Sequence, residues 1–161
     1  MNQHTARFIR QMKDPLKYKL FLFAKLPAAY FSGVRIREID EQHCLTTVPF
    51  KWLSQNPFRS TYFACLSMAA ELSTGALAMA HLYKSDPPVS MLVTKVESEY
   101  FKKATGRTWF RCADGDRFKI AIAECIQTGE ARQVVAESIG KNPAGEIVAR
   151  FLITWSFKSK R

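Results

Sequence analysis

The chain has 161 residues, of which 47% are hydrophobic and 12% aromatic, with no low-complexity run. This length and composition fit one globular domain, residues 1–161, and they exclude a disordered chain and leave little room for two independent domains. Lysine and arginine outnumber aspartate and glutamate by 24 to 14, and the formal net charge of +10 favours anionic partners: nucleic acid, anionic lipid or the phosphates of a small ligand.

The first predicted elements are helices, which make up an N-terminal helical extension over residues 1–31. A short helix is expected at residues 4–13. Asp14 followed by Pro15 is a helix-start signal, because an aspartate N-cap accepts backbone N–H groups and proline suits the first helical position. A second helix is therefore expected to begin there and to end before Pro27.

A hairpin and a long helix follow. Gly33 opens the run "VRIREID", an acidic turn at residues 40–42 closes it, and "HCLTTVPF" runs back as the second strand. Residues 60–83 are rich in alanine, leucine and methionine and contain no proline, which predicts the longest helix of the chain. Asn56 or Ser60 is expected to cap this helix.

The next elements are strands. Residues 89–104 alternate with period two, turn at residues 105–106 and continue into residues 107–114, which predicts a pair of long antiparallel strands.

The last third combines a short element with a hairpin. Residues 117–128 have an apolar face at helical spacing, with Asp116 as a cap and Gly129 as a stop, although a strand is the competing interpretation. Residues 131–157 form a long hairpin around the turn "KNPAGE", and a frayed basic tail is expected at residues 158–161. One long helix against a mostly antiparallel sheet is an α+β arrangement.

Glu71 is the only formally charged residue between Arg59 and Lys84. On a helix that advances about 100° per residue, Ser67 and Thr74 lie within about 60° of the same direction, so Glu71 belongs to a small polar face. The other sides are apolar, and such a helix is packed on most sides. A buried carboxylate without a partner is destabilising or shifts its pKa upward.

Two interpretations of Glu71 remain open. It can be the structural partner of an arginine from the sheet, and the chain offers four candidates: Arg107, Arg111, Arg132 and Arg150. It can instead be a general base or a nucleophile, because burial brings the pKa of a carboxyl group toward neutral pH, where catalysis can use it.

No metal site is expected. The four cysteines are scattered, without a CxxC pair or a histidine at metal-ligand spacing. We expect them to be small buried hydrophobic residues: Cys44, Cys65, Cys112 and Cys125. The chain also contains no glycine-rich phosphate motif.

The N-terminus lacks the apolar core of a signal peptide, and polar residues interrupt the long apolar helix, so we expect a cytoplasmic protein without a transmembrane span. Residues 15–31 combine Lys17, Lys19 and Lys25 with leucines and phenylalanines, and they can lie on anionic lipid or form a lid over the sheet. The run "YFKKATGRTWFR" interleaves aromatic and basic residues as base-stacking surfaces do, but a half-buried strand has the same pattern, and we do not expect nucleic acid as a partner.

Three stretches, "LPAAYFSGVRIREID", "NPFRSTYFACLSMAAELSTG" and "ESEYFKKATG", resemble the hotdog-fold thioesterase-like superfamily, in particular a poorly characterised bacterial branch. The likeness covers roughly residues 15–157. It implies a long central helix wrapped by an antiparallel sheet, homodimers or dimers of dimers, and acyl-thioester sites between protomers.

The resemblance also implies catalytic roles. Glu71 matches the acidic residue that, in phenylacetate-type and aryl-CoA thioesterases, activates water or attacks the thioester carbonyl from this helix. Asn56 matches a polar residue often found just before the helix. We expect Thr74 or Ser67 to orient the water.

Ligand contacts are expected at two further places. Lys102 and Lys103 match a strand end where related enzymes often place a basic residue near the coenzyme A phosphates. Tyr62, Phe63 and Ala64 lie at the helix start, where those enzymes carry glycines whose N–H groups bind the carbonyl oxygen. Backbone donors at this helix start can stabilise an oxyanion, or Phe63 can fill the acyl pocket instead.

Two functions follow. The first is hydrolysis of acyl-CoA or acyl-carrier-protein thioesters, in which coenzyme A is part of the substrate and no separate cofactor is required. The second is noncatalytic binding of acyl-CoA or fatty-acyl groups in the same tunnel. Turnover of acyl-CoA by the wild type and by Glu71→Gln separates them.

Overall fold

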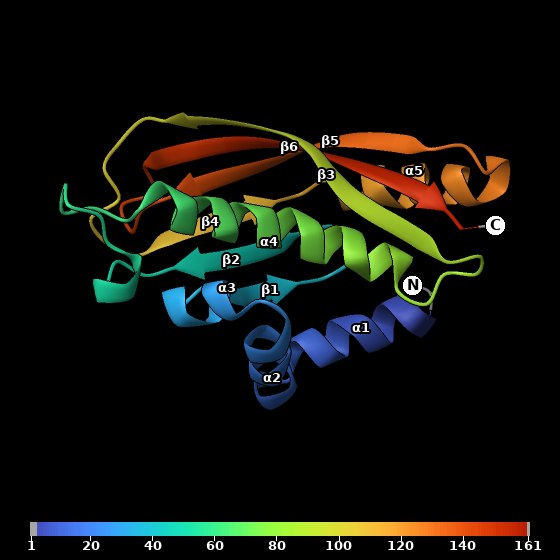
Figure 1. Ribbon diagram of the computed structural model, residues 1–161, viewed down its shortest axis with the longest axis horizontal. Helices are drawn as coiled ribbons and strands as arrows, with labels where there is room; N and C mark the ends of the chain where they lie inside the picture. Colours follow the sequence, from blue (N-terminus) through green and yellow to red (C-terminus); the bar gives the residue numbers. More distant parts are fainter. Residues whose placement is uncertain (1–2, 161) are drawn as a thin grey trace.

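A six-stranded sheet curves around one long helix, α4 (Phe63–Leu82), in the computed structural model, which describes residues 3–160 (Figure 1). The strands are β1 (Arg35–Ile39), β2 (Cys44–Val48), β3 (Val89–Tyr100), β4 (Thr108–Cys112), β5 (Arg132–Lys141) and β6 (Ile147–Ser159). Their order in the sheet is β1-β2-β4-β5-β6-β3, and every pairing is antiparallel. The predicted α+β arrangement is confirmed.

The other helices are α1 (Gln3–Lys13), α2 (Pro15–Lys25), α3 (Pro27–Ser32) and α5 (Gly115–Thr128), together with a short 3-10 turn, η1 (Trp52–Ser54). Strands β2, β4 and β5 contact α4 along the sheet, and α1 and α5 pack against other sides of it. The long helix therefore forms the centre of the core.

The burial of α4 follows from its sequence. The helix is apolar on nearly every side, and Leu72 and Leu77 are among its many buried residues. The Thr46 hydroxyl on β2 donates to the Ala69 carbonyl at 2.7 Å, which ties the helix to the sheet. By length and composition α4 would qualify as a membrane span, but 67% of its most apolar window is buried inside the fold, as expected of a core helix.

The start of α2 is formed as predicted. Asp14 Oδ1 accepts hydrogen bonds from the N–H groups of Leu16 and Lys17, both at 3.1 Å, and a proline occupies the first turn. The helix ends before Pro27, which itself begins the next helix, α3. Local cap chemistry thus explains both boundaries.

The N-terminal helices dock on the body of the protein through two contacts. The N–H of Ile36 in β1 donates to the Tyr18 hydroxyl of α2 at 2.9 Å. The Phe8 ring of α1 packs on Tyr83, just after α4, with centroids 5.3 Å apart. These contacts hold α1 and α2 along the β1 and α4 side of the molecule (Figure 1).

The predicted pairing of residues 89–104 with 107–114 is wrong. β3 pairs along its length with β6, whereas β4 lies between β2 and β5. Alternation identifies a strand but not its partner, and residues 101–107 carry the chain away from β3 to the other part of the sheet (Figure 1).

The predicted cap of α4 is also wrong. The N-cap position is Tyr62, and no side chain caps the helix. Asn56 and Ser60 lie in the preceding loop, where the N–H of Asn56 donates to the Ser60 carbonyl at 2.9 Å. The loop closes on itself before the helix begins, so its polar side chains cannot reach the first turn.

The helix predicted at residues 117–128 is confirmed as α5, and the competing interpretation as a strand is wrong. Its N-cap is Asp114, so the predicted cap, Asp116, lies in the first turn instead. Phe118 and Ile122 are buried on the predicted apolar face. Gly129 ends the helix with a φ of 75°, a left-handed conformation that glycine adopts without strain.

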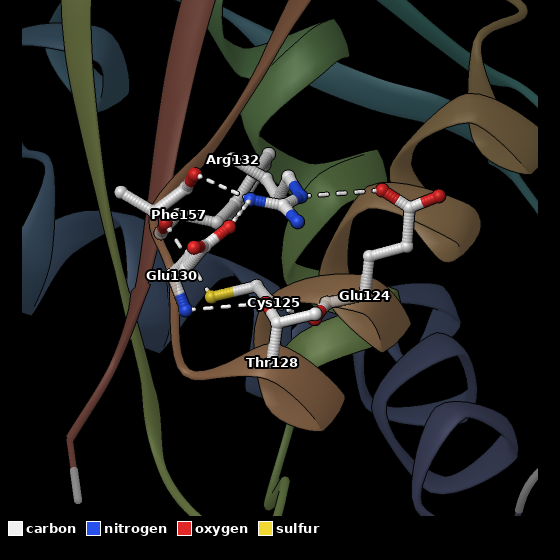
Figure 2. Close-up of polar contacts among 7 residues, drawn as sticks. Glu124, Cys125, Thr128, Glu130, Arg132 and Phe157 are labelled. Atoms are coloured by element: carbon white, nitrogen blue, oxygen red, sulfur yellow. Dashed lines mark hydrogen bonds and ion pairs between the residues drawn. The ribbon is translucent and has the colours of Figure 1, made fainter.

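Polar contacts hold the end of α5 to the sheet (Figure 2). The Arg132 guanidinium at the start of β5 lies 3.3 Å from the Glu124 carboxylate and 3.0 Å from that of Glu130. The Cys125 thiol contacts the Phe157 carbonyl of β6 at 3.5 Å. All four cysteines are buried and free, as predicted.

The basic tail is more ordered than predicted. β6 continues to Ser159, and the N–H of Lys160 donates to the Pro88 carbonyl at 2.8 Å. The expected fraying is therefore wrong up to Lys160, because the residues before β3 provide a partner for this end of the chain. Arg161 lies outside the described residues.

Candidate active site

Glu71 lies midway along α4 and faces a partly open cavity of about 250 Å³, here called the Glu71 cavity. Apolar side chains from both the N-terminal helices and the sheet line it, among them Phe8, Phe21 and Trp155. Of its thirteen lining residues, only Glu71 and Lys25 carry a charged group. The acid therefore stands in apolar surroundings.

Burial raises the pKa of Glu71 above the ordinary 4.5, because an apolar environment disfavours the charged carboxylate. Among residues 3–160, no cation or hydrogen-bond donor contacts this carboxylate to offset the shift. Arg132 and Arg150 form ion pairs with other glutamates, and neither Arg107 nor Arg111 pairs with Glu71. In the described chain, the interpretation of Glu71 as a structural ion-pair partner is wrong.

Gly75 leaves the space that the Glu71 carboxylate occupies. A methyl group at Gly75 would lie 3.2 Å from Glu71 Oε1 and 3.1 Å from Trp155 Cζ2. Both distances are tighter than ordinary van der Waals contact. The glycine one turn after the acid thus allows the indole ring and the carboxylate to lie side by side.

Thr74 anchors that indole ring. Its hydroxyl accepts the Trp155 Nε1–H at 2.9 Å and donates to the Glu71 carbonyl at 3.0 Å. Thr74 is buried and does not line the cavity. Because its proton is already donated, the hydroxyl positions the tryptophan, and its predicted role in orienting water stays a prediction.

A second cavity, of about 600 Å³, lies at the start of α4 and is here called the helix-start cavity. It gathers five of the predicted site residues: Asn56, Tyr62, Phe63, Lys102 and Lys103. The N–H and hydroxyl of Thr61 both donate to the Ala104 carbonyl, at 2.8 and 3.1 Å, and so join the loop before α4 to the segment between β3 and β4.

The amide of Asn56 is oriented by its own loop. Its Oδ1 accepts from the N–H of Phe58 at 3.0 Å and from the N–H and hydroxyl of Ser60, both at 3.2 Å. Because backbone N–H groups can donate only to the oxygen of the amide, the Asn56 Oδ1 must point toward the loop, and the NH₂ group therefore points away from it. No acceptor within residues 3–160 engages this NH₂ group.

The backbone N–H groups at the start of α4 are available as hydrogen-bond donors. The N–H groups of Phe63 and Ala64 make no hydrogen bond within the described chain, as expected where a helix begins without a side-chain cap. The exposed Phe63 ring lines the cavity and packs edge-to-face on Tyr62, with centroids 5.0 Å apart.

The two lysines of the helix-start cavity differ in their contacts. Lys102 Nζ lies 2.7 Å from both carboxylate oxygens of Glu146. Lys103 Nζ has only a long contact, 3.5 Å, to the Phe58 carbonyl. The ammonium of Lys103 is therefore the more available for an anionic ligand.

Two other predicted residues lie outside both cavities. The Ser67 hydroxyl donates to the Phe63 carbonyl at 3.0 Å, one turn earlier. The Ala64 side chain lines neither cavity, so only its backbone N–H is placed to take part in a site. Glu71 is eight residues beyond Phe63, which corresponds to about 12 Å along the helix. In one chain, the acid and the helix-start donors thus serve different cavities.

Sequence reasoning missed the residues that shape the Glu71 cavity. Trp155 comes from β6 and Phe8 from α1, and neither is near Glu71 in sequence. A tryptophan on the inward side of a strand needs a hydrogen-bond acceptor for its indole N–H. This requirement is the one feature of the sequence that could have suggested a contact between Trp155 and a buried threonine such as Thr74.

Metal ligands and histidines play no part in either cavity. Residues 3–160 contain no group of three or more histidine, cysteine, aspartate or glutamate residues arranged to hold a metal ion. The His81 Nε2 lies 2.8 Å from the Glu41 carbonyl, so this ring connects α4 to the turn between β1 and β2. Burial lowers the pKa of His81.

Comparison of the sequence with known proteins gives a family but no function. The model of a protein family described as "Domain of unknown function (DUF4442)" matches residues 18–157. No curated protein matches the sequence significantly.

Solved structures show the fold that the chain shares with other proteins. A protein of unknown function from Pseudomonas aeruginosa, described as a probable thioesterase, superposes with a TM-score of 0.76 at 20% identity, covering 91% of this chain and 97% of that one. A protein of unknown function from Chlorobaculum tepidum gives a TM-score of 0.76 at 17% identity, with 90% and 94% covered. A thioesterase from Haemophilus influenzae superposes with a TM-score of 0.62 at 11% sequence identity, covering 87% of this chain and 88% of that one. The predicted hotdog fold is confirmed.

Proposed function

The chain belongs to the family described as a domain of unknown function (DUF4442) and has a thioesterase-like hotdog fold, and on that premise we propose that it hydrolyses the thioesters of acyl-CoA or of acyl-carrier protein. The observation that carries the proposal is the Glu71 carboxylate, which faces a largely apolar cavity and contacts no cation or hydrogen-bond donor among the described residues, although the Lys25 side chain lines the same cavity. A carboxylate left unpaired in such a place lowers stability, and a catalytic role gives a reason to keep it there.

Glu71 acts as a general base in this scheme. Its carboxylate takes a proton from water, the resulting hydroxide adds to the thioester carbonyl, and the C–S bond of the tetrahedral intermediate breaks. The proton held by Glu71 then passes to the departing thiolate, which gives a carboxylic acid and a thiol. Direct attack by Glu71, followed by hydrolysis of the anhydride, is the alternative route to the same products.

The oxyanion of the intermediate needs donors. The free N–H groups of Phe63 and Ala64 and the NH₂ group of Asn56 supply them, all at the helix-start cavity. A single donor of this kind is worth about 3 kcal/mol in the transition state. Lys103, and Lys102 if it leaves Glu146, bind the coenzyme A phosphates at the same cavity.

Because the acid and the donors are about 12 Å apart in one chain, we infer that they meet across a homodimer, with Glu71 from one protomer and the helix start from the other. The surface of β3 supports this inference. Val96 and Tyr100 lie opposite Ile153 and Ala149 of β6, on the side of the sheet that faces the core. They are nevertheless 51% and 45% exposed, so this apolar strip lacks a cover in the single chain.

Acyl-CoA substrates of increasing chain length test the activity, with release of the thiol as the measurement. We expect Glu71→Gln to lower kcat/KM at least 100-fold, because general-base catalysis contributes about 10²- to 10⁴-fold. Glu38→Gln, a change of an exposed glutamate on β1, is the matched control and should retain the wild-type rate. Equal rates in wild type and Glu71→Gln would remove Glu71 from the mechanism.

Phe63 favours a second candidate function, noncatalytic binding of acyl groups. Its ring lines the helix-start cavity at the position where the resembled thioesterases carry a glycine. In that case acyl-CoA binds saturably and no thiol is released. Phe63→Gly separates the two functions, since removing the ring should speed turnover in an enzyme and should leave a binding protein without turnover.

A further inference from the structure

The outer side of α2 carries a row of exposed apolar residues, Leu16, Leu20 and Phe23, here called the α2 ridge. Their side chains are 69%, 60% and 55% exposed. The spacing of four and three residues places them on one side of the helix. The opposite side is also apolar, since Tyr18 and Leu22 are buried against the body of the protein. The ridge is therefore an apolar face that α2 does not need for its own packing.

Aromatic residues extend the ridge over α3. The Phe23 ring packs edge-on against Tyr30, at 5.3 Å between centroids, and against Phe31, at 6.2 Å. Phe31 is itself exposed. Single exposed apolar residues are ordinary on protein surfaces, but a contiguous cluster of them marks a binding surface.

A basic groove lies between α1 and α2, and two of its lining residues, Pro15 and Lys17, flank Leu16 of the ridge in sequence. It has a volume of about 670 Å³, and its charged lining residues are Arg7, Arg10, Lys13, Lys17 and a single acid, Asp14. Residues 3–32 contain six lysines and arginines against that one aspartate, which leaves +5, half of the formal net charge of +10 of the whole chain.

Few of these cations are neutralised. Lys17 lies 3.6 Å from Asp14, and Lys13 is near enough to Asp40 to help lower the pKa of that carboxyl group. Arg7 and Arg10 form no ion pair within residues 3–160, and the same holds for Lys19 and Lys25 on α2. The region is thus apolar and positively charged at once.

We propose that this face, the α2 ridge together with the basic groove, binds the surface of an anionic lipid bilayer. The ridge enters the boundary between headgroups and acyl chains, and Arg7, Arg10 and Lys13 lie at the lipid phosphates. An apolar stripe flanked by lysines and arginines is the pattern of helices that lie in a membrane interface. A protein interface of ordinary composition is depleted of lysine at its centre. A nucleic acid is bound mainly through its phosphates, and a row of exposed leucines would not contribute to that binding.

The position of the face in the fold agrees with this partner. Figure 1 shows α2 at the margin of the molecule, beyond α1 and α3, whereas β3 and β6 lie on the other side of α4. A dimer formed through β3 would leave the α2 ridge free. The proposal does not depend on the thioesterase activity, because neither Glu71 nor the helix-start cavity takes part in it.

Vesicle binding tests the proposal. Wild-type protein should cosediment with vesicles that contain phosphatidylglycerol and phosphatidylcholine at low salt, should bind vesicles of phosphatidylcholine alone at least tenfold more weakly, and should be released at about 0.5 M salt because salt screens surface charge. Absence of binding to the anionic vesicles at low salt would overturn the proposal.

Two pairs of substitutions separate the contribution of the apolar ridge to membrane binding from that of the basic groove. Leu20→Ser with Phe23→Ser removes most of the ridge, and Arg7→Gln with Arg10→Gln removes two of the cations. We expect each pair to weaken partition at least tenfold, since one basic residue near an anionic surface contributes about fivefold. The matched control is Ile120→Ser, an exposed isoleucine on α5, which should bind as the wild type does. Unchanged binding in the ridge variant would overturn the proposal.

A label on the ridge gives a second measurement that does not depend on the amount bound. The four native cysteines are buried, so a cysteine introduced as Leu20→Cys can be labelled selectively with an environment-sensitive dye. Its emission should shift to the blue on anionic vesicles, whereas a dye at Ile120→Cys should not respond. If Leu20→Ser with Phe23→Ser instead converts a dimer to a monomer in sedimentation velocity, the ridge is covered by a second copy and the proposal is wrong.

Discussion

At the scale of single residues, the proposed activity depends on Glu71 and its neighbours. The carboxylate gains no ion pair and no hydrogen bond from the described residues, while Gly75 and Trp155 shape the space around it. Thr74 holds the tryptophan in place. The partly buried acid, the small residue one turn later and the anchored indole ring form one unit, although only the first of the three is a reactive group.

The pKa of Glu71 makes stability depend on pH. Burial raises this pKa in the folded state above the ordinary 4.5, so the folded protein binds more protons than the unfolded chain between the two pKa values. Stability therefore falls as pH rises from about 4.5 through the folded pKa. We expect Glu71→Gln to raise the free energy of unfolding at pH 7, and to have little effect below pH 4, where the carboxyl group is largely protonated in both states. Urea unfolding at both pH values measures the difference, and a lower stability at pH 7 would contradict it.

The same shift predicts the pH dependence of the proposed activity. Because a general base must be deprotonated, kcat/KM for an acyl-CoA should rise with pH, with its inflection above 4.5. The residual turnover of Glu71→Gln should lack this inflection. An unchanged profile in the variant would assign the titration to another group.

Thr74→Val tests the positioning of Trp155. Valine has nearly the same shape as threonine but leaves the buried indole N–H without an acceptor, which should lower the free energy of unfolding by about 1–3 kcal/mol. Ser67→Ala, at a more accessible position two turns earlier on the same helix, should stay within about 0.5 kcal/mol of the wild type. Denaturant unfolding of both variants measures the contrast, and equal stabilities would show that the hydrogen bond to Trp155 contributes nothing.

At the scale of secondary structure, α2 serves two surfaces. Phe21 and Lys25 line the Glu71 cavity from its inner side, and the α2 ridge faces outward. The helix depends on a local cap as well as on packing, because Asp14 accepts two backbone hydrogen bonds in its first turn.

We expect Asp14→Ala to loosen α2 specifically. Loss of the cap should make the amides of the first turns of α2 exchange with solvent several-fold faster, as hydrogen–deuterium exchange can show. Exchange in α5, which does not contain Asp14 and has Asp114 at its N-cap position, is the internal control. Uniformly faster exchange in both helices would indicate global destabilisation and contradict a local role.

At the scale of the whole molecule, the proposed dimer and the proposed activity both depend on the exposed strip of β3. Val96→Lys should keep the protein folded, because this side chain is exposed, but it should convert the proposed dimer to a monomer and abolish acyl-CoA hydrolysis. Light scattering coupled to size-exclusion chromatography and the thiol-release assay measure the two effects. Ile120→Lys on α5 is the control. A monomeric variant with full activity would contradict a site shared between protomers.

Local features could be predicted because their causes lie within a few residues. The Asp14–Pro15 start of α2 and the Gly129 end of α5 depend on hydrogen bonds and backbone angles of adjacent positions. The cap of α4 could not be predicted in this way. The loop around Asn56 closes on itself, and the helix begins after Tyr62 without a side-chain cap.

Composition and hydrophobic periodicity, which act over short distances along the chain, were enough to predict one long apolar helix with a single acid at the centre of an α+β fold. The partner of β3, the residues that surround Glu71 and the separation of the acid from the helix-start donors became visible only in the folded chain. These depend on contacts between segments far apart in sequence, such as Phe8, Glu71 and Trp155, and no local pattern specifies which distant segments meet.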